Sequence, residues 1–149
     1  EISLGLVGSE MCIRDSCNHD RFLSPDSMIG EIQRACAESE QMVPQTPAQL
    51  AAVVYHSLAV CYGEAVSQLR ECRGKSYNAL SIIGGGGNAA YLNRLTAETT
   101  GCTVYAGPGE ATAIGNAAAQ MLSFGELGSV SEIRECVRHS FDVTIVQKK

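Results

Sequence analysis

The chain has 149 residues, enough for one ordinary domain core or for a piece of a larger domain. Hydrophobic residues make up 45% of it and charged residues 18%, which is typical of a soluble globular protein rather than a disordered one. The net charge is −5 and the basic residues are scattered, so neither nucleic acid nor an anionic membrane is expected as a partner.

The longest apolar stretch and the cysteines bear on where the protein works. Residues 48–66 are interrupted by Gln49, His56 and Glu64, which predicts a buried amphipathic helix rather than a membrane span. The seven cysteines form no CxxC pair, and no histidine stands at zinc-ligand spacing from them. Neither a metal site nor a redox motif is therefore predicted. Reduced thiols without a secretory signal pattern favour the cytoplasm.

Residues 1–16 show neither a helical nor a strand period, and they carry no turn or cap signal at their junction with the next segment. They resemble an extraneous stretch that recurs at the ends of automatically assembled sequences. We therefore expect the protein's own sequence to begin near Cys17.

Two helices are predicted next. The first has Ser24 as its N-cap and Pro25 at the first helical position. Its apolar face comprises Met28, Ile29, Ile32, Ala35 and Cys36. The second opens with a capping box of Thr46 and Gln49 and ends at Gly74. Its apolar stripe comprises Leu50, Val54, Leu58, Cys61, Ala65 and Leu69.

The hydrophobic period then changes. Residues 79–83 and 102–106 are short apolar runs typical of strands, and a helix capped by Asn88 and stopped by Gly101 is predicted between them. This βαβ unit predicts two parallel strands with a right-handed crossover.

Three more elements complete the predicted α/β fold. A helix rich in small residues is predicted over 110–124, and another begins at a capping box of Ser129 and Glu132. Residues 141–146 predict an edge strand.

The glycine run 84–87 stands directly after a strand and before a helix. Such a place brings main-chain amides and a helix N-terminus together, which favours a phosphate or a nucleotide pressed close to the chain. Two other interpretations fit the run equally well: a tight turn without a ligand, and close packing of the helix on the strand. The glycines alone do not decide between them.

A dinucleotide-binding site is a weak match. Gly84, Gly86 and Ala89 satisfy the loose fingerprint, but the second strand ends at Tyr105 without the acidic residue that binds the ribose. Glu110 lies beyond that turn, where it complements a helix dipole. A Walker loop is excluded because no Lys followed by Ser or Thr comes after the glycines.

No catalytic arrangement is predicted. His19, His56 and His139 are far apart, and no Ser/His/Asp or Cys/His set can be assembled. Five acids occupy helical positions that predict solvated faces: Glu31, Glu38, Glu64, Glu71 and Glu98.

Residues 82–122 resemble the C-terminal lobe of the FGGY carbohydrate kinases. Their pattern is a glycine triplet, a Leu-Asn helix with an Ala-acid step, an AGP turn, then EAT, GN and Gln. The matching positions are Gly84 to Gly86, Leu92, Asn93, Ala97, Glu98, Ala106 to Pro108, Glu110 to Thr112, Gly115, Asn116 and Gln120. With upstream sequence that also agrees, the resemblance covers 17–146.

The resemblance implies an incomplete ribonuclease-H-like lobe of the actin and hexokinase type. It also implies transfer of the ATP γ-phosphate, with Mg²⁺, to the 1-hydroxyl of L-rhamnulose in L-rhamnose catabolism. ATP contact is implied for Gly84, Gly85 and Gly86, with Gly85 as the principal contact. Gly87 and Asn88 adjoin that contact and complete the expected nucleotide-binding residues. Their positions depart from the pattern or vary in it, and Asn88 is alternatively only a helix cap.

The resemblance also implies what the chain lacks. The general-base aspartate, the sugar-binding residues and the N-terminal phosphate loop of the family would precede Asp20. Because phosphoryl transfer needs groups from both lobes, we expect an inactive fragment with no catalytic and no metal-binding residue of its own. Two alternatives stay open: a dinucleotide-binding half domain of an oxidoreductase, and a helical interaction module in which residues 84–87 only turn the chain.

Overall fold

The computed structural model describes residues 17–148, so the expectation that residues 1–16 are extraneous lies outside the described part. The chain divides into two compact units, with the boundary between Ser76 and Tyr77. Each unit forms a hydrophobic cluster of its own.

The first unit is helical. It comprises a short 3₁₀ helix η1 (Asp20–Phe22), α1 (Met28–Glu38) and α2 (Pro47–Arg73). Its core forms where one face of α1 meets the first turns of α2, and the aromatic ring of Phe22 in η1 packs against it. The packed residues are Phe22, Ile32, Cys36, Leu50, Ala52 and Val53.

Helix α1 begins later than predicted. Its N-cap is Ser27, whose Oγ accepts a hydrogen bond from the Gly30 amide at 3.2 Å, and not Ser24. Met28 and Ile29 are 45% and 56% exposed, so the predicted apolar face is too wide. Either serine can cap a helix, and only the folded backbone, extended at Ser27 with φ −142°, decides between them.

Helix α2 has the predicted ends. The Gln49 amide donates to Thr46 Oγ1 at 3.2 Å and the Thr46 amide donates to Gln49 Oε1 at 3.0 Å, which confirms the capping box. Gly74 ends the helix in the left-handed region at φ 60°. The predicted stripe is partly wrong, because Val54 and Leu69 are 37% and 47% exposed. The buried positions of α2 are Ala52, Val53, Ser57, Ala59, Cys61 and Val66.

Helix α2 is also long and apolar enough to cross a bilayer by length and composition, with a mean hydropathy of 1.3 over an 18-residue window. Among the described residues it is the one helix that meets this test. Core helices of soluble proteins meet it too, so the test by itself is weak evidence for a membrane.

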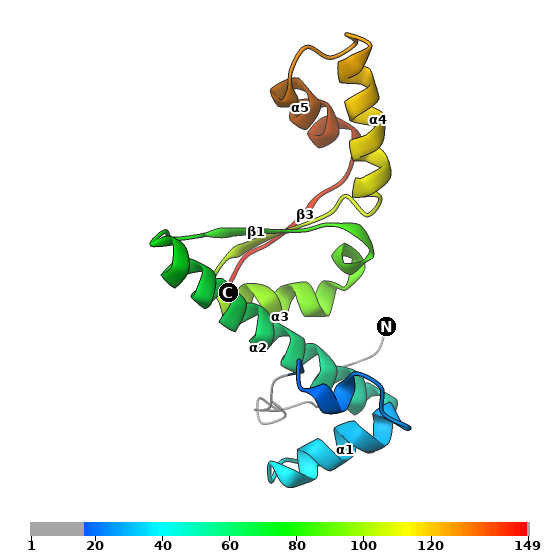
Figure 1. Ribbon diagram of the computed structural model, residues 1–149, viewed down its shortest axis with the longest axis vertical. Helices are drawn as coiled ribbons and strands as arrows, with labels where there is room; N and C mark the ends of the chain where they lie inside the picture. Colours follow the sequence, from blue (N-terminus) through cyan, green and yellow to red (C-terminus); the bar gives the residue numbers. More distant parts are fainter. Residues whose placement is uncertain (1–16, 149) are drawn as a thin grey trace. The chain divides into compact units, whose positions relative to one another are not determined.

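The second unit contains the predicted βαβ motif. Strands β1 (Ala79–Ile82) and β2 (Thr103–Ala106) are parallel, and α3 (Ala90–Thr100) connects them. Strand β3 (Thr144–Val146) adds to β2 in the antiparallel direction and gives the order β1-β2-β3. Helix α3 lies along the sheet (Figure 1). The parallel pair and the edge strand confirm the sequence predictions.

Strand register sorts the side chains of the sheet onto two faces. Val104 pairs with Leu80 on one side and Val146 on the other, and all three pack with Ala97 of α3. The intervening Tyr105 points to the opposite face and is 38% exposed. This period of two places the core of the unit between α3 and one sheet face.

Helices α4 (Ala111–Ser123) and α5 (Val130–Ser140) pack against each other in the same unit. Helix α4 has the predicted extent within one residue. At the start of α5, Ser129 Oγ accepts from the Glu132 amide at 3.2 Å, and the Glu132 carboxylate accepts from the Gly128 amide at 2.9 Å. Ser129 is therefore the N-cap, as predicted, but the Glu132 carboxylate bonds the Gly128 amide in place of the Ser129 amide that a capping box would use.

Candidate functional site

The glycine run forms a short 3₁₀ helix of its own. This helix, η2 (Gly84–Asn88), stands between β1 and α3. The prediction that Asn88 caps α3 is wrong, because the N-cap is Ala89 and no side chain caps that end. The Ala89 amide instead donates to the Gly86 carbonyl at 3.1 Å, so the chain completes one tight turn before the α-helix begins.

A second turn lies against η2. It comes directly after β2 and contains Gly107 and Pro108. The Gly107 amide donates to the Ile82 carbonyl at 2.8 Å, and the Gly84 amide donates to the Pro108 carbonyl at 3.2 Å. Because β1 and β2 are parallel, their carboxyl ends meet at one edge of the sheet, where ligands of α/β proteins commonly bind. The candidate site is therefore two turns joined by two main-chain hydrogen bonds.

Three glycines of these turns are explained by the fold alone. Gly84 has φ 75°, a region that favours glycine. A Cβ on Gly87 would lie 3.1 Å from the Gly107 amide nitrogen and 3.4 Å from the Ile82 carbonyl oxygen. Gly107 has φ 118°, and a Cβ there would lie 2.8 Å from the Asp142 carbonyl oxygen. At these positions turn geometry and close packing are sufficient reasons for glycine.

Three other glycines have no such reason. A Cβ on Gly85 or on Gly109 would meet no atom within 4 Å, and one on Gly86 would make an ordinary 3.6 Å contact with Ile82 Cγ2. None of the three has a positive φ, and all are exposed. They form a surface of bare main chain on which a flat group can lie close to the backbone.

Sequence reasoning missed part of this arrangement. The sequence alone assigns no role to Gly107 or Gly109, because their place beside η2 depends on strand pairing. Asn93 was noted without a role, yet it is 2% exposed and its Nδ2 donates to the Gly87 carbonyl at 2.8 Å. A polar residue on the apolar face of a helix was the available signal.

Few charged groups belong to this site. Strand β2 ends at Tyr105 and Ala106, so the ribose-binding acid of a dinucleotide site is absent from that position, as the sequence predicts. Within residues 17–148 no three His, Cys, Asp or Glu side chains are grouped so that they could hold a metal ion. The two turns offer main-chain donors and acceptors, together with the exposed side chain of Asn88.

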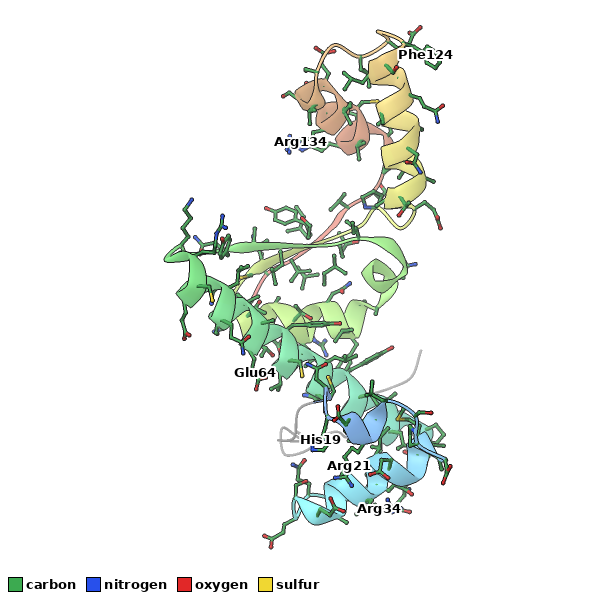
Figure 2. The ribbon with its side chains drawn as sticks, in the orientation of Figure 1. His19, Arg21, Arg34, Glu64, Phe124 and Arg134 are labelled. Atoms are coloured by element: carbon green, nitrogen blue, oxygen red, sulfur yellow. The ribbon has the colours of Figure 1, made fainter. Side chains whose placement is uncertain are left out.

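The clearest charge cluster lies in the first unit (Figure 2). Arg21 contacts the carboxylates of Glu31 at 2.5 Å and Glu38 at 2.6 Å, and Arg34 contacts Glu31 at 2.7 Å. The prediction that Glu31 is solvated is wrong, since its side chain is 12% exposed. The hydrogen bond from Arg21 lowers the pKa of Glu38, and the same bond raises the pKa of Arg21. This network joins η1 to α1 and is structural.

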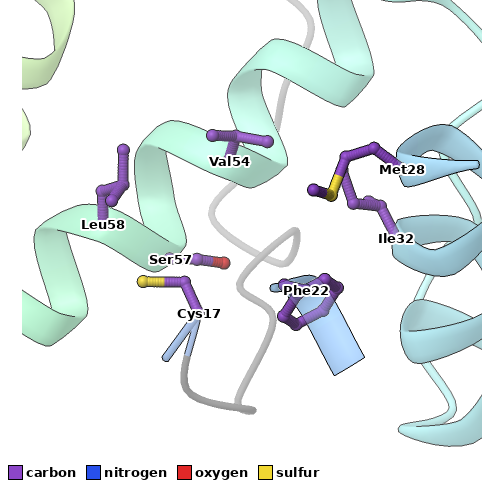
Figure 3. A pocket seen from close by; sticks show the side chains of 7 residues that line it. All are labelled: Cys17, Phe22, Met28, Ile32, Val54, Ser57 and Leu58. Carbon is purple, nitrogen blue, oxygen red and sulfur yellow. The ribbon is translucent and has the colours of Figure 1, made fainter. Parts of the chain in front are cut away.

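The first unit also contains a cavity of about 250 Å³. Apart from Cys17 and Ser57 its lining is apolar, with Phe22 and Ile32 among the wall residues (Figure 3). Burial and the neighbouring Cys61 thiol, 3.1 Å away, raise the pKa of Cys17 to about 11, so this thiol stays neutral at ordinary pH. A neutral, apolar recess does not bind phosphate, and we assign it no role in nucleotide binding.

Comparison with known proteins identifies a family. Residues 19–124 match the C-terminal domain of the FGGY family of carbohydrate kinases. A protein named rhamnulokinase from Oceanobacillus iheyensis is 44% identical over 124 residues, which is 83% of this chain and 26% of that protein. Proteins of the same name from Enterococcus faecalis and Bacillus subtilis are each 42% identical over 132 residues, covering 87% and 89% of this chain and 27% of each relative. The chain thus spans about a quarter of the length of these relatives.

Proposed function

Because this chain belongs to the FGGY family of carbohydrate kinases, we propose that it is the C-terminal part of a longer enzyme that transfers a phosphoryl group from ATP to a sugar. The sugar we propose is L-rhamnulose, phosphorylated on its 1-hydroxyl, which the names of the relatives support. The family match does not favour the dinucleotide-binding half domain or the helical interaction module as alternatives.

The bare main-chain surface at the sheet edge supports the nucleotide contact. Gly85 and Gly86 are glycines that neither backbone conformation nor packing requires, so a ligand that approaches the main chain closely accounts for them. In the proposal ATP lies against Gly84, Gly85 and Gly86, with Gly85 as the principal contact. Gly87, which packs against the Gly107 turn, and Asn88, which ends η2, complete the proposed nucleotide-binding residues at the edge of this contact.

The residues of this chain bind and orient the nucleotide, and ATP itself supplies the phosphoryl group. Mg²⁺ accompanies ATP in the proposal, and we assign it no side chain here, since no three His, Cys, Asp or Glu side chains are grouped within residues 17–148. The base that activates the sugar hydroxyl belongs to the remainder of the enzyme. The proposal includes a ribonuclease-H-like lobe, a cytoplasmic location and the foreign origin of residues 1–16.

Two experiments test this proposal. The coding DNA upstream of Asp20 should encode, in frame, the N-terminal lobe of a carbohydrate kinase. An assay of L-rhamnulose-dependent ADP formation should show turnover by that longer product and only background by the 149-residue chain. Clear turnover by the chain alone would overturn the division of labour proposed here, and an unrelated upstream reading frame would overturn the kinase assignment.

A further inference from the structure

We propose that Asn93 is a positioning residue that holds the glycine turn η2 in its nucleotide-binding shape. The inference rests on the proposed nucleotide contact and adds a residue to it. Asn93 lies in the first turn of α3, where its main-chain amide donates to the Ala89 carbonyl at 2.9 Å. Side chains of a helix lean toward its N-terminus, so Asn93 reaches back to the turn that precedes α3.

The bond that Asn93 makes completes the end of η2. The last carbonyl groups of a helical turn have no donor within it. Asn93 Nδ2 donates to one of them, the Gly87 carbonyl, at 2.8 Å. Gly87 has no side chain of its own with which to fix the turn, and a Cβ there would crowd the Gly107 amide. The side chain of Asn93 therefore holds Gly87 in place through the Gly87 carbonyl.

The same side chain is a poor choice for packing alone. Asn93 is 2% exposed, and its Oδ1 is buried without a hydrogen-bond partner among the described residues. A buried, unpartnered acceptor lowers stability, and leucine has a similar size without that cost. Stability therefore does not explain an asparagine at this position, whereas the bond to the turn does.

Helix α3 offers a matched control at Thr96. Thr96 is 1% exposed and its Oγ1 donates to the Leu92 carbonyl at 2.8 Å, a bond within the helix that does not reach η2. Asn93→Leu and Thr96→Val each remove one buried side-chain hydrogen bond from the same helix. Only the first of them releases the glycine turn.

The test compares three chains by NMR: the wild type, Asn93→Leu and Thr96→Val. In Asn93→Leu we expect amide hydrogen exchange at Gly85, Gly86 and Gly87 to rise about tenfold, and ATP to bind about tenfold more weakly, the effect of losing roughly one hydrogen bond. The thermal midpoint should stay close to that of the wild type, because removal of the unpartnered Oδ1 offsets the loss of the donor to the Gly87 carbonyl. Thr96→Val should leave both the exchange at the turn and the ATP affinity unchanged.

Asn93→Asp is the second variant, since it keeps the side-chain shape and removes the donating amide. Unchanged exchange at the turn in a folded Asn93 variant would overturn the positioning role. Failure of both Asn93 variants to fold would overturn it as well, because Asn93 would then serve the stability of the whole unit. Absence of ATP binding by the wild-type chain is a separate result, which contradicts the proposed function and not the bond between Asn93 and the turn.

Discussion

The amide nitrogen of Gly107 lies 2.8 Å from the carbonyl oxygen of Ile82, and this hydrogen bond joins the turn after β2 to the last residue of β1. The second bond, from the Gly84 amide to the Pro108 carbonyl, joins the same turn to η2. The glycine run is therefore one half of a two-turn surface. Packing accounts for the glycines between the turns, and nucleotide contact is proposed for those that face outward.

Gly87→Ala tests the packing between the two turns. The added methyl would lie 3.1 Å from the Gly107 amide nitrogen, a main-chain atom that cannot rotate away. We expect the free energy of unfolding to fall by about 1–3 kcal/mol in urea denaturation. Gly85→Ala is the control, because its methyl would meet nothing within 4 Å. Its stability should match or slightly exceed the wild type, and an equal loss in both variants would contradict the packing described.

Gly107→Ala should be more damaging. The residue has φ 118°, and an added Cβ would lie 2.8 Å from the Asp142 carbonyl oxygen. Backbone strain and overpacking each cost about 1–3 kcal/mol, so we expect a loss of more than about 2 kcal/mol. Hydrogen exchange should show the loss of protection at β3. Gly109→Ala in the same turn should leave β3 protected, since its methyl has open space.

The ion pairs of Arg21 predict a dependence of stability on pH. Its hydrogen bond lowers the pKa of Glu38 in the folded state. A group with a lowered folded pKa stabilises the protein above its unfolded pKa, about 4.3 for Glu, and that stabilisation disappears as the pH falls through the folded value. Glu38→Gln should therefore be less stable than the wild type near neutral pH, and the difference should vanish in acid.

The control for this titration is Glu71→Gln, which changes an exposed glutamate of α2 outside the network. Its stability should follow the wild type from neutral pH to acid. High salt should also reduce the Glu38 effect, because Glu38 is exposed and its ion pair is screened. A difference between Glu38→Gln and the wild type that persists undiminished in acid would contradict the ion-pair explanation.

Alkylation rates of the cysteines test the fold of both units. Cys72 and Cys136 are exposed and should react fastest with iodoacetamide. Mass spectrometry of the digested protein measures the reaction at each cysteine-containing peptide. Cys17 should react slowly although it is only partly buried, because its pKa is raised to about 11 and the thiolate is the reactive form. Cys102 is buried and should react only on unfolding. Labelling of Cys17 as fast as that of Cys72 would contradict the Cys17–Cys61 contact.

The sequence correctly predicts those parts of the fold that signals within a few residues determine. The change of period after Gly74, the glycine stop at Gly101 and the capping box at Thr46 act within a few residues, and all three appear as predicted. The predicted start of α1 is wrong because two nearby serines have equal capping ability. The folded backbone, extended at Ser27, decides between them.

The candidate site is harder to predict because its contacts are distant in the sequence. Nothing in the run 84–87 distinguishes Gly87, which packs against Gly107, from Gly85, which faces open space. That difference arises only when β1 and β2 pair. Asn88 belongs to the 3₁₀ helix, and α3 begins one residue later without a side-chain cap.

The proposed nucleotide contact at the glycine turn is tested most directly by NMR titration of the isotope-labelled chain with ATP, ADP and NAD at millimolar concentrations. We predict that ATP and ADP shift the amide signals of Gly84, Gly85 and Gly86, and that Gly85→Leu abolishes these shifts while the rest of the spectrum is retained. NAD should have a weaker effect. Absence of shifts at these amides, or equal shifts with NAD, would contradict the claim that this turn is a kinase nucleotide contact.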